Sequence, residues 1–419
     1  MVKLGYKQTE IGVIPEDWEI SKLGNIGQFK NGINKDKDKF GYGVPIIGLM
    51  DVFGKNHINS TSNSGLVDAS PYEQEDYSLK EGDVLFVRSS VKPAGVGLTA
   101  VVEQTLQNAV FSGFLLRYRT EKMTVGFKRY VFYASYFREN LIAASTVSAN
   151  TNINQDSLKQ LVLAYPTNEA EQNKIAQTIS SIDALLLSLE KQISKKKAIK
   201  QGAMQELLTG KKRLPGFTGT WKEVKLADIS LKITDGSHES PPESDVGYYM
   251  PSVKDMTDIG FDYSGCKKIS FSDFKKLERN GCRPNVGDVL IAKDGSILKY
   301  AFVQEKTEDI VILSSIAIVK PHPSYVDSYF LAQYFRQNQF VDKVITNYKS
   351  GTGVPRIVLK GFKQITLCIP DSVAEQAEIA EILVGMDKEI YELEQKLEKY
   401  RQIKQGMMQK LLTGKIRLV

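Results

Sequence analysis

One stretch of sixteen residues occurs twice in this sequence, and the repeat constrains the fold more than any other feature. Residues 199–214 read IKQGAMQELLTGKKRL and residues 403–418 read IKQGMMQKLLTGKIRL, so thirteen of sixteen positions are identical at an offset of 204 residues. A duplication at a long, constant offset indicates two copies of one structural unit. The chain is therefore predicted to fold as two similar halves.

Upstream of each copy, apolar residues recur at alternating spacings of four and three residues. This spacing keeps one apolar stripe of a helix facing a partner helix, as in a coiled coil. Because the stripe occurs in both halves, each helix has a natural partner in the other. The predicted seam consists of Ile175, Ile179, Ile182, Leu186, Leu189 and Ile193 in the first half, and of Leu383, Met386, Ile390, Leu393 and Leu397 in the second.

The two helices have recognisable ends. Ser372 stands three residues before Glu375, and the segment Asn168–Glu171 repeats this arrangement, which is that of a capping box at a helix start. Gly210 and Gly414 follow the last apolar turns, where glycine can adopt the left-handed conformation that ends a helix. The pattern predicts helices of about 40 residues, roughly 60 Å long.

A β-rich framework precedes each helix. Trp18 and Trp221, the only two tryptophans, occupy equivalent places, which suggests one buried ring in each of two similar domains. The predicted fold class is therefore α+β, with two similar β-rich domains and two long helices. The matched segments are, as strands, 81–88 with 286–293 and 111–118 with 313–320, and, as helices, 130–140 with 329–338.

The two halves differ most in residues 33–80 and 237–285, which have no evident correspondence. One framework with two unlike variable segments suits two unlike ligands. The alternative is that both segments are surface loops, which tolerate change in any protein.

The charge distribution is uneven. The net charge is +6, yet residues 191–213 alone carry a net charge of +7. A basic helix face can follow a phosphate backbone, be solvated, or pair with acidic groups, and charge alone favours the solvated face. No apolar run is long enough to span a membrane, and the N-terminus lacks a signal-peptide pattern, so a cytoplasmic location without membrane contact is expected.

Motifs for catalysis and cofactors are absent from the sequence. It has no GxxxxGK[ST] loop for ATP, and its three histidines are isolated from each other and from the three cysteines, which form no CxxC pair. Residues 95–100 match a loose dinucleotide fingerprint, but Pro93 before it and valines after it disfavour the required helix. We therefore expect a non-catalytic chain with free thiols, no metal and no cofactor.

Taken together, these motifs resemble the specificity subunit of a type I restriction-modification complex over the whole chain. The residues that carry the resemblance are Ile14–Trp18, Gly82-Asp83 with Gly287-Asp288, Thr234–His238, Gly351–Arg356 and the repeated helix ends. The resemblance implies target recognition domains at 1–166 and 214–370, with helical spacers at 167–213 and 371–419. One departure is that Thr234–His238 aligns with Lys30–Ile33, which lacks the aspartate and the histidine.

The resemblance also implies a mechanism. Each domain would read one half of an asymmetric, bipartite site in the major groove of double-stranded DNA. The two helices, packed antiparallel, would set the gap between the half-sites and dock two methyltransferase subunits, which restriction subunits would join. Methylation and ATP-dependent cleavage would then belong to those partner subunits.

Candidate DNA-binding residues follow the matched strands or lie in the unmatched motif of the second domain. Arginine and lysine can contact guanine, with a discrimination of about 1–3 kcal/mol for a bidentate contact. Matched positions in both domains serve a common framework or a phosphate contact more readily than two different targets. The candidates are Arg88, Lys92, Asp235, Ser237, His238, Lys293 and Ser296.

A second function fits the same features, namely a coiled-coil interaction protein whose twin domains bind other proteins. The two hypotheses differ in their response to salt, because neutralising phosphates makes DNA affinity fall steeply as salt rises.

Overall fold

The computed structural model describes residues 4–147, 150–350 and 355–418. Its contacts divide the chain into two compact units, an N-terminal unit of residues 1–188 and 397–419 and a C-terminal unit of residues 189–396. Each unit therefore combines one β-rich domain with the start of the helix that follows it and the end of the other helix. The two units divide inside the helical spacers expected at residues 167–213 and 371–419. The four segment boundaries expected from the sequence therefore stay predictions.

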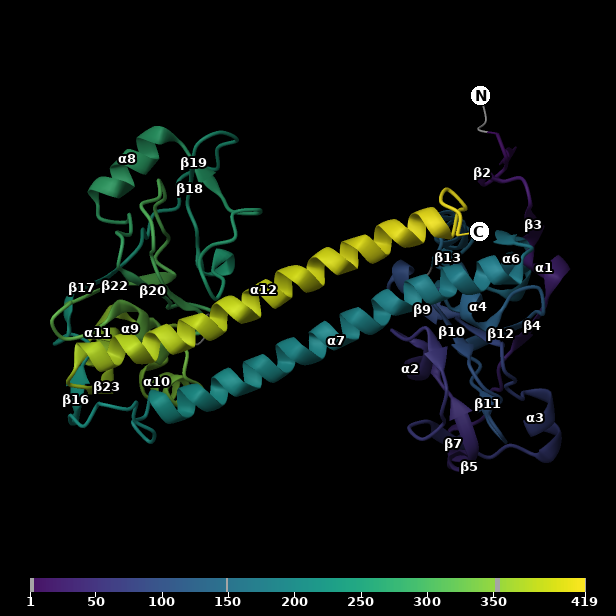
Figure 1. The fold of residues 1–419 in the computed structure, drawn as a ribbon, viewed down its shortest axis with the longest axis horizontal. Helices are drawn as coiled ribbons and strands as arrows, with labels where there is room; N and C mark the ends of the chain where they lie inside the picture. Colours follow the sequence, from purple (N-terminus) through teal and green to yellow (C-terminus); the bar gives the residue numbers. More distant parts are fainter. Residues whose placement is uncertain (1–3, 148–149, 351–354, 419) are drawn as a thin grey trace. The chain divides into compact units, whose positions relative to one another are not determined.

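The domain of the N-terminal unit is built on a five-stranded sheet with the order β4-β12-β8-β10-β6. Figure 1 labels β4, β10 and β12 of this sheet. All neighbours are antiparallel except β10 and β6. The five strands are β4 (Gln28–Asn31), β6 (His57–Ile58), β8 (Val84–Val87), β10 (Thr99–Val102) and β12 (Leu115–Arg119).

Smaller sheets and short helices surround this sheet. The paired strands are β1 (Tyr6–Thr9) with β2 (Gly12–Pro15), β3 (Trp18–Lys22) with β15 (Val162–Pro166), β5 (Phe40–Ile47) with β7 (Gly65–Val67) and β11 (Val110–Phe111), and β14 (Thr151–Asn152) with β9 (Ser89–Ser90) and β13 (Thr146–Val147). The helices are α1 (Leu23–Ile26), η1 (Lys37–Lys39), α2 (Leu49–Val52), α3 (Pro71–Asp76), η2 (Pro93–Gly95), α4 (Val125–Val131), α5 (Ser135–Ala143) and α6 (Gln155–Gln160).

The domain of the C-terminal unit repeats the central part of this architecture in a four-stranded sheet with the order β17-β22-β20-β21. Its strands are β17 (Ser230–Asp235), β20 (Val289–Ala292), β21 (Ala301–Val303) and β22 (Ile316–Pro321), and further pairs are β16 (Trp221–Lys225) with β23 (Thr366–Pro370) and β18 (Tyr248–Tyr249) with β19 (Lys268–Ile269). The helices are η3 (Val253–Asp255), α8 (Phe271–Arg279), α9 (Ser328–Tyr334), α10 (Asn338–Tyr348) and α11 (Leu359–Gln364).

The matched Gly-Asp turns each enter a central strand, as the sequence predicts. Gly82 and Gly287 have φ angles of 81° and 88°, in the left-handed region that favours glycine. The following aspartates close the turns, because Asp83 accepts the Lys80 N–H at 2.8 Å and Asp288 accepts the Asn285 N–H at 2.8 Å. Strands β8 and β20 are then fully buried at the centre of their sheets.

The two predicted helical segments, 130–140 and 329–338, are each divided between two helices. A continuous helix over either segment is therefore wrong. A turn separates α4 from α5, and another separates α9 from α10. These turns bring buried aromatic rings together on both sides of the break, with the Phe132 and Phe137 centroids 5.5 Å apart and those of Phe335 and Phe340 5.4 Å apart. Core packing therefore decides where these helices stop.

The variable segments share one element that the sequence comparison missed. In each unit a serine caps a short helix ahead of the Gly-Asp turn, with Ser70 accepting the Glu73 N–H before α3 and Ser270 accepting the Asp273 N–H before α8. The framework thus extends further into the variable segments than residue identities indicate.

The long helices α7 (Glu169–Leu207) and α12 (Val373–Leu411) contain 39 residues each and continue through Gly202 and Gly406. Gly210 and Gly414, with φ angles of 70° and 68°, follow their last turns, which confirms the predicted ends. Within each unit the helices run antiparallel, since the start of one is paired with the end of the other. No helix in the described ranges combines the length and apolar character that a membrane span requires.

The seam positions differ in what covers them. At the start of α7, Ile175 and Ile179 are fully buried in the same core cluster as Phe127 and Leu163, so these turns pack on the domain. Ile379 and Leu383 belong to the equivalent cluster of the C-terminal unit. Of the predicted seam, Ile175, Ile179, Leu189, Ile193, Leu383, Ile390 and Leu397 are buried, and Ile182, Leu186, Met386 and Leu393 are half-buried.

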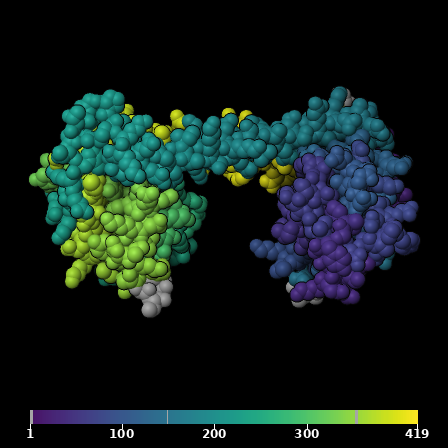
Figure 2. Space-filling view, turned by 90° about the horizontal axis from the view of Figure 1, so that it is seen from below, coloured from purple at the N-terminus to yellow at the C-terminus, as the bar shows by residue number. Residues whose placement is uncertain are grey.

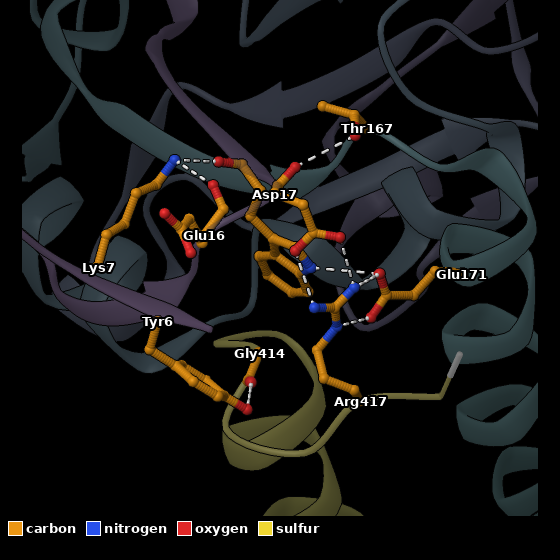
Figure 3. A network of polar contacts seen from close by, with 9 residues as sticks. Tyr6, Lys7, Glu16, Asp17, Thr167, Glu171, Gly414 and Arg417 are labelled. Carbon is orange, nitrogen blue, oxygen red and sulfur yellow. Dashed lines mark hydrogen bonds and ion pairs between the residues drawn. The ribbon is translucent and has the colours of Figure 1, made fainter. Parts of the chain in front are cut away.

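Of the two capping boxes predicted at the helix starts, the Ser372 box is half formed and the Asn168 box is not formed, because Asn168 accepts the Ala170 N–H at 2.8 Å. Ser372 accepts the Glu375 N–H at 3.3 Å, but the Glu375 carboxylate binds Arg213 through two hydrogen bonds of 2.7 and 2.8 Å instead of reaching back. In the N-terminal unit the Glu171 carboxylate likewise binds Arg417 (Figure 3). A full positive charge is a stronger partner for a buried carboxylate than a backbone N–H.

These ion pairs hold the end of the chain against its beginning. Arg417 also binds Asp17, and the Tyr6 hydroxyl donates to the Gly414 carbonyl at 3.1 Å (Figure 3). In Figure 2 the yellow C-terminal atoms accordingly lie against the purple and blue N-terminal domain, as expected for one compact unit. The N-terminal unit is therefore completed by residues at the far end of the chain.

The two tryptophans are not equally buried, so the expectation of one buried ring in each domain is only half right. Trp18 is 1% exposed and its Nε1–H donates to Glu171 at 3.3 Å. Trp221 is half-buried, and its Nε1 has no hydrogen-bond partner among the described residues. Trp18 is therefore more deeply buried than Trp221, and only Trp18 uses its indole N–H in a hydrogen bond among the described residues.

Candidate nucleic-acid interface

In the C-terminal domain, the candidate residues lie at the edge of the sheet where β17 and β20 end. Lys293 directly follows β20, and its ammonium lies 3.4 Å from Asp235 and 3.2 Å from Asp294. The imidazole of His238 lies 3.4 Å from the same Asp235 oxygen, Oδ2, that Lys293 approaches. The structure thus brings together residues that are far apart in sequence, on one edge.

Burial separates these candidates into two groups. Lys293 and Ser237 are each 5% exposed; Lys293 is held between two carboxylates, and the Ser237 hydroxyl donates to the Glu239 carbonyl. Asp235 is also largely covered, whereas His238 and Ser296 are exposed. The inward-facing residues can shape this edge, and the exposed residues can reach a ligand.

The N-terminal domain presents an equivalent edge where β8 ends. The Ile153 N–H donates to the carbonyl of Arg88, and the Ile357 N–H donates to the carbonyl of Lys293, so Arg88 and Lys293 occupy equivalent backbone positions. Arg88 is half-buried, and Lys92 is exposed in the loop that precedes η2. Arg88 and Lys293, which the sequence matches at the ends of two strands, are therefore also equivalent in the structure.

Two further residues at these edges were missed by the sequence analysis as candidates. Arg356 is exposed and pairs through its backbone with Asp294, while Asn152 pairs with Ser89 in the same place of the other domain. Arg356 belongs to a motif that supported the family resemblance, so its place in that motif was an available signal. The remainder of that motif, Gly351–Val354, lies outside the described residues.

The motif Thr234–His238 of the second domain and its counterpart Lys30–Ile33 in the first domain can be compared at one backbone position. Ser237 forms a parallel bridge with Leu313, and Ile33 forms the equivalent bridge with Ser112. Gly236 and Gly32 precede them, and a Cβ on either glycine would lie about 2 Å from a carbonyl oxygen, at 2.1 and 2.0 Å. The backbone is conserved between the units, while the side chain changes from a hydroxyl to a buried isoleucine.

The basic stretch at the end of α7 is largely paired within the C-terminal unit. Lys196 binds Glu389 at 2.5 Å and Lys197 binds Glu394 at 2.7 Å, both on α12. These lysines therefore neutralise acidic groups of their own unit. The basic stretch does not form a continuous row of unpaired charges that could follow a phosphate backbone.

A buried polar network lies where α7, α9 and α12 meet. The Asp387 carboxylate accepts hydrogen bonds from Lys200 at 2.6 Å, from Arg336 at 2.7 Å and from the side-chain amide of Gln333 at 2.7 Å. Burial and the nearby Arg336 charge lower the pKa of Lys200 to about 8. Burial alone would raise the pKa of Asp387, but Arg336 and Lys200 hold it below its usual range.

The N-terminal unit has the matching network at an offset of 204 residues. There the Asp183 carboxylate forms an ion pair with Lys404 at 2.6 Å and accepts a hydrogen bond from the Tyr130 hydroxyl at 2.9 Å. Within the residues that the structure describes, no three His, Cys, Asp or Glu side chains gather in a way that would hold a metal ion.

Comparison with known proteins gives consistent matches over the whole chain. The family described as type I restriction modification DNA specificity domain matches twice, over residues 15–200 and 218–405. A Methanocaldococcus jannaschii protein described as the MjaX specificity subunit of a type I restriction enzyme is 27% identical, with 99% of this chain and 97% of the relative covered. The MjaVIII specificity subunit of the same organism is 22% identical, with 97% and 94% covered.

Two solved structures share the fold. The S subunit of a type I restriction-modification system from M. genitalium has a TM-score of 0.57 at 14% identity, with 94% of this chain and 96% of that chain covered. A chain from a structure concerned with complex assembly and conformational transition of a type I system also has a TM-score of 0.57, at 15% identity, with 96% and 99% covered.

Proposed function

This chain belongs to the family of type I restriction-modification DNA specificity proteins, and we propose that each of its domains reads one half of an asymmetric, bipartite DNA site in the major groove. Family membership confirms the resemblance found in the sequence motifs. The chain itself would carry no catalytic group; methyl transfer and ATP-dependent cleavage would take place on partner subunits.

One observation carries the proposal. The two domains present the same backbone edge with different side chains, as Ser237 and Ile33, Lys293 and Arg88, and Arg356 and Asn152 occupy equivalent positions. A protein that reads two different sequences on one scaffold needs this combination, because base edges differ while the phosphate backbone does not.

The exposed residues at each edge, together with the half-buried Asn152, are the proposed DNA contacts. Arg356 can donate two hydrogen bonds to guanine, and His238 and Ser296 lie on the same edge. In the N-terminal domain, Lys92 is suited to a phosphate contact and Asn152 to an adenine contact. Asp235, Ser237, Lys293 and Arg88 would position these residues.

The long helices are proposed to set the gap between half-sites and to dock two methyltransferase subunits, with restriction subunits joining them. The seam side chains pack within the chain, so docking would use apolar residues that remain exposed at repeated positions. Leu187 and Tyr391 are 53% and 43% exposed, and Ile199 and Ile403 are 48% and 38% exposed. Exposed apolar side chains repeated at one offset are suited to two copies of one partner.

The test is a genome-wide map of adenine methylation in cells that express this chain together with a type I methyltransferase subunit. We expect a split, asymmetric motif with a fixed gap that appears only when the chain is present. No new motif, despite a stable complex with the methyltransferase, would remove the DNA-reading function. Salt-insensitive binding without sequence preference by the purified chain would instead favour the protein-binding alternative.

A further inference from the structure

The C-terminal unit contains a groove along the first half of α12 that the DNA-reading edge does not use. Two adjoining hollows of about 820 and 310 Å³ form it, and they share Asp258, Phe302 and Tyr391 among their lining residues. Residues 256–263 and strand β21 form the wall opposite α12. All of these residues belong to one compact unit.

The groove is strongly acidic and rich in aromatic side chains. The basic residues that line it are only Lys306, Arg336 and Lys388. Tyr329 and Tyr391 are partly exposed on either side of the smaller hollow. Seven carboxylates line it, and four of them, Asp258, Glu308, Asp387 and Glu394, form ion pairs. The other three, Asp262, Glu305 and Glu392, form no ion pair among the described residues. Such a surface repels phosphate, so nucleic acid is not its ligand.

A second, independent observation is an unused hydrogen-bond acceptor on a residue that lines the groove. Gln333 lines the smaller hollow and is 3% exposed. Its Nε2 donates to Asp387 at 2.7 Å, while its Oε1 has no hydrogen-bond partner among the described residues. A buried carbonyl oxygen without a donor is costly, so a ligand that brings an N–H group would be stabilised there.

The N-terminal unit has a cleft at the equivalent place with different chemistry. That cleft, of about 770 Å³, is lined by Asp183 and Leu187, which match Asp387 and Tyr391. Its other walls carry Lys55 and Arg129 together with serines and asparagines. The repeat therefore offers two similar hollows, of which only the C-terminal one is acidic and aromatic.

We propose that the acidic groove of the C-terminal unit receives an arginine-bearing segment of a methyltransferase subunit, an inference that rests on the proposed docking of that subunit to the helices. An arginine side chain meets each requirement of the site. Its stem packs on Phe302, its planar group stacks on a tyrosine, and its several N–H groups reach Gln333 Oε1 and the rim carboxylates together. Because the N-terminal cleft lacks these groups, the two methyltransferase copies bind unequally.

The test uses the full chain and purified methyltransferase subunit in calorimetric titrations. The groove variant combines Glu305→Gln with Glu392→Gln, both exposed residues. The matched control combines Glu81→Gln with Glu121→Gln, two exposed acidic residues of the N-terminal domain that change the net charge equally. A third variant, Glu392→Lys, reverses one charge at the rim.

We expect the groove variant to weaken one of the two binding steps by about tenfold or more, with a smaller dependence on salt, while the control leaves both steps unchanged. Glu392→Lys should weaken the same step further. Equal binding by wild type and groove variants would overturn the inference and leave the proposed function intact. Failure of the wild-type chain to bind the methyltransferase at all would instead contradict the proposed docking.

The identity of the bound segment is tested by a photo-crosslinker in place of Ile259, which is 46% exposed and lines both hollows. A crosslink to an arginine-containing peptide of the methyltransferase is expected in the assembled complex. A crosslink to DNA, to a second copy of this chain, or to a methyltransferase peptide without arginine would overturn the inference.

Discussion

Arg417 and Glu171 form a two-bonded ion pair with distances of 2.5 and 2.7 Å, and Arg213 and Glu375 form the same pair in the other unit. Each arginine follows the end of one long helix, and each glutamate lies in the first turn of the other. Both carboxylates are 1% exposed, so the arginines provide the charge that makes their burial tolerable. Helix ends and helix starts are thereby joined twice.

Replacing either arginine by alanine should destabilise its own unit, and Arg213→Ala should cost more than Arg417→Ala. Glu171 keeps the Trp18 Nε1–H as a donor after Arg417 is removed, whereas the equivalent Trp221 Nε1 donates to no described residue. We expect losses of about 3–5 and 2–4 kcal/mol respectively, because a buried carboxylate is left without its counter-charge.

The measurement is denaturant unfolding followed by tryptophan fluorescence. Each unit contains one of the two tryptophans, so Trp18→Phe and Trp221→Phe backgrounds report the units separately. Lys222→Ala, which breaks an exposed ion pair with Asp371, is the control and should change stability by less than about 1 kcal/mol. Equal losses in the two arginine variants would contradict the assigned role of Trp18.

Glycines at two kinds of position should respond in opposite directions to substitution by alanine. Gly414 has a φ angle of 68°, and a Cβ there would lie 2.3 Å from Pro15, so Gly414→Ala should destabilise the N-terminal unit by about 2 kcal/mol or more. Gly202 lies inside α7 with nothing within 4 Å of an added Cβ, so Gly202→Ala should stabilise by about 0.5–1 kcal/mol. Thermal unfolding of both variants decides this, and destabilisation by Gly202→Ala would count against a helix that is unbroken there.

The buried Lys200 should give the C-terminal unit a specific pH dependence. Burial lowers its pKa from 10.5 to about 8, so between these values the unfolded chain binds a proton that the folded chain does not. The unfolding free energy therefore rises with pH in that range as far as this group is concerned. Relative to Lys200→Met, the wild-type stability should increase by about 1 kcal/mol between pH 7 and pH 9.

The stability difference between wild type and Lys200→Met is obtained from denaturant unfolding at each pH with Trp221 as the probe. Both proteins share every other titrating group, so their difference isolates Lys200. A difference that stays constant from pH 7 to pH 9 would mean that Lys200 binds its proton equally in the folded and unfolded chains.

At the DNA-reading edges, Arg356→Ala and Lys92→Ala should have different consequences. Loss of a guanine contact by Arg356 should cost about 1–3 kcal/mol on the cognate site and relax specificity at one base pair. Loss of a phosphate contact by Lys92 should weaken binding to all sequences and reduce the slope of log affinity against log salt by about one.

Fluorescence anisotropy with cognate and scrambled duplexes over a salt series separates the two cases, with Lys222→Ala as the control. If Arg356→Ala weakened both duplexes equally, Arg356 would be a phosphate contact and not a base-reading residue. If neither substitution changed DNA binding, the proposed edges would be the wrong surface.

The sequence by itself determined the features that depend on local pattern. The repeat at a constant offset indicated two units, the apolar spacing and the terminal glycines delimited two long helices, and the Gly-Asp turns located the central strands. The repeat is found by comparing two distant stretches of sequence. The helix and turn signals rest on residues within a few turns of one another, whose backbone preferences act before any long-range contact forms. The breaks near Phe132 and Phe335 were missed because core packing, not a local signal, ends those helices.

Tertiary structure alone decided which parts belong together and which charges remain available. Glu171 was expected to cap its own helix, yet it binds Arg417, 246 residues away. Lys293 was a candidate for DNA contact, yet it is buried between Asp235 and Asp294. In both cases a charged side chain took the partner that offset its burial, and the identity of that partner depends on contacts between distant segments, which no local pattern encodes.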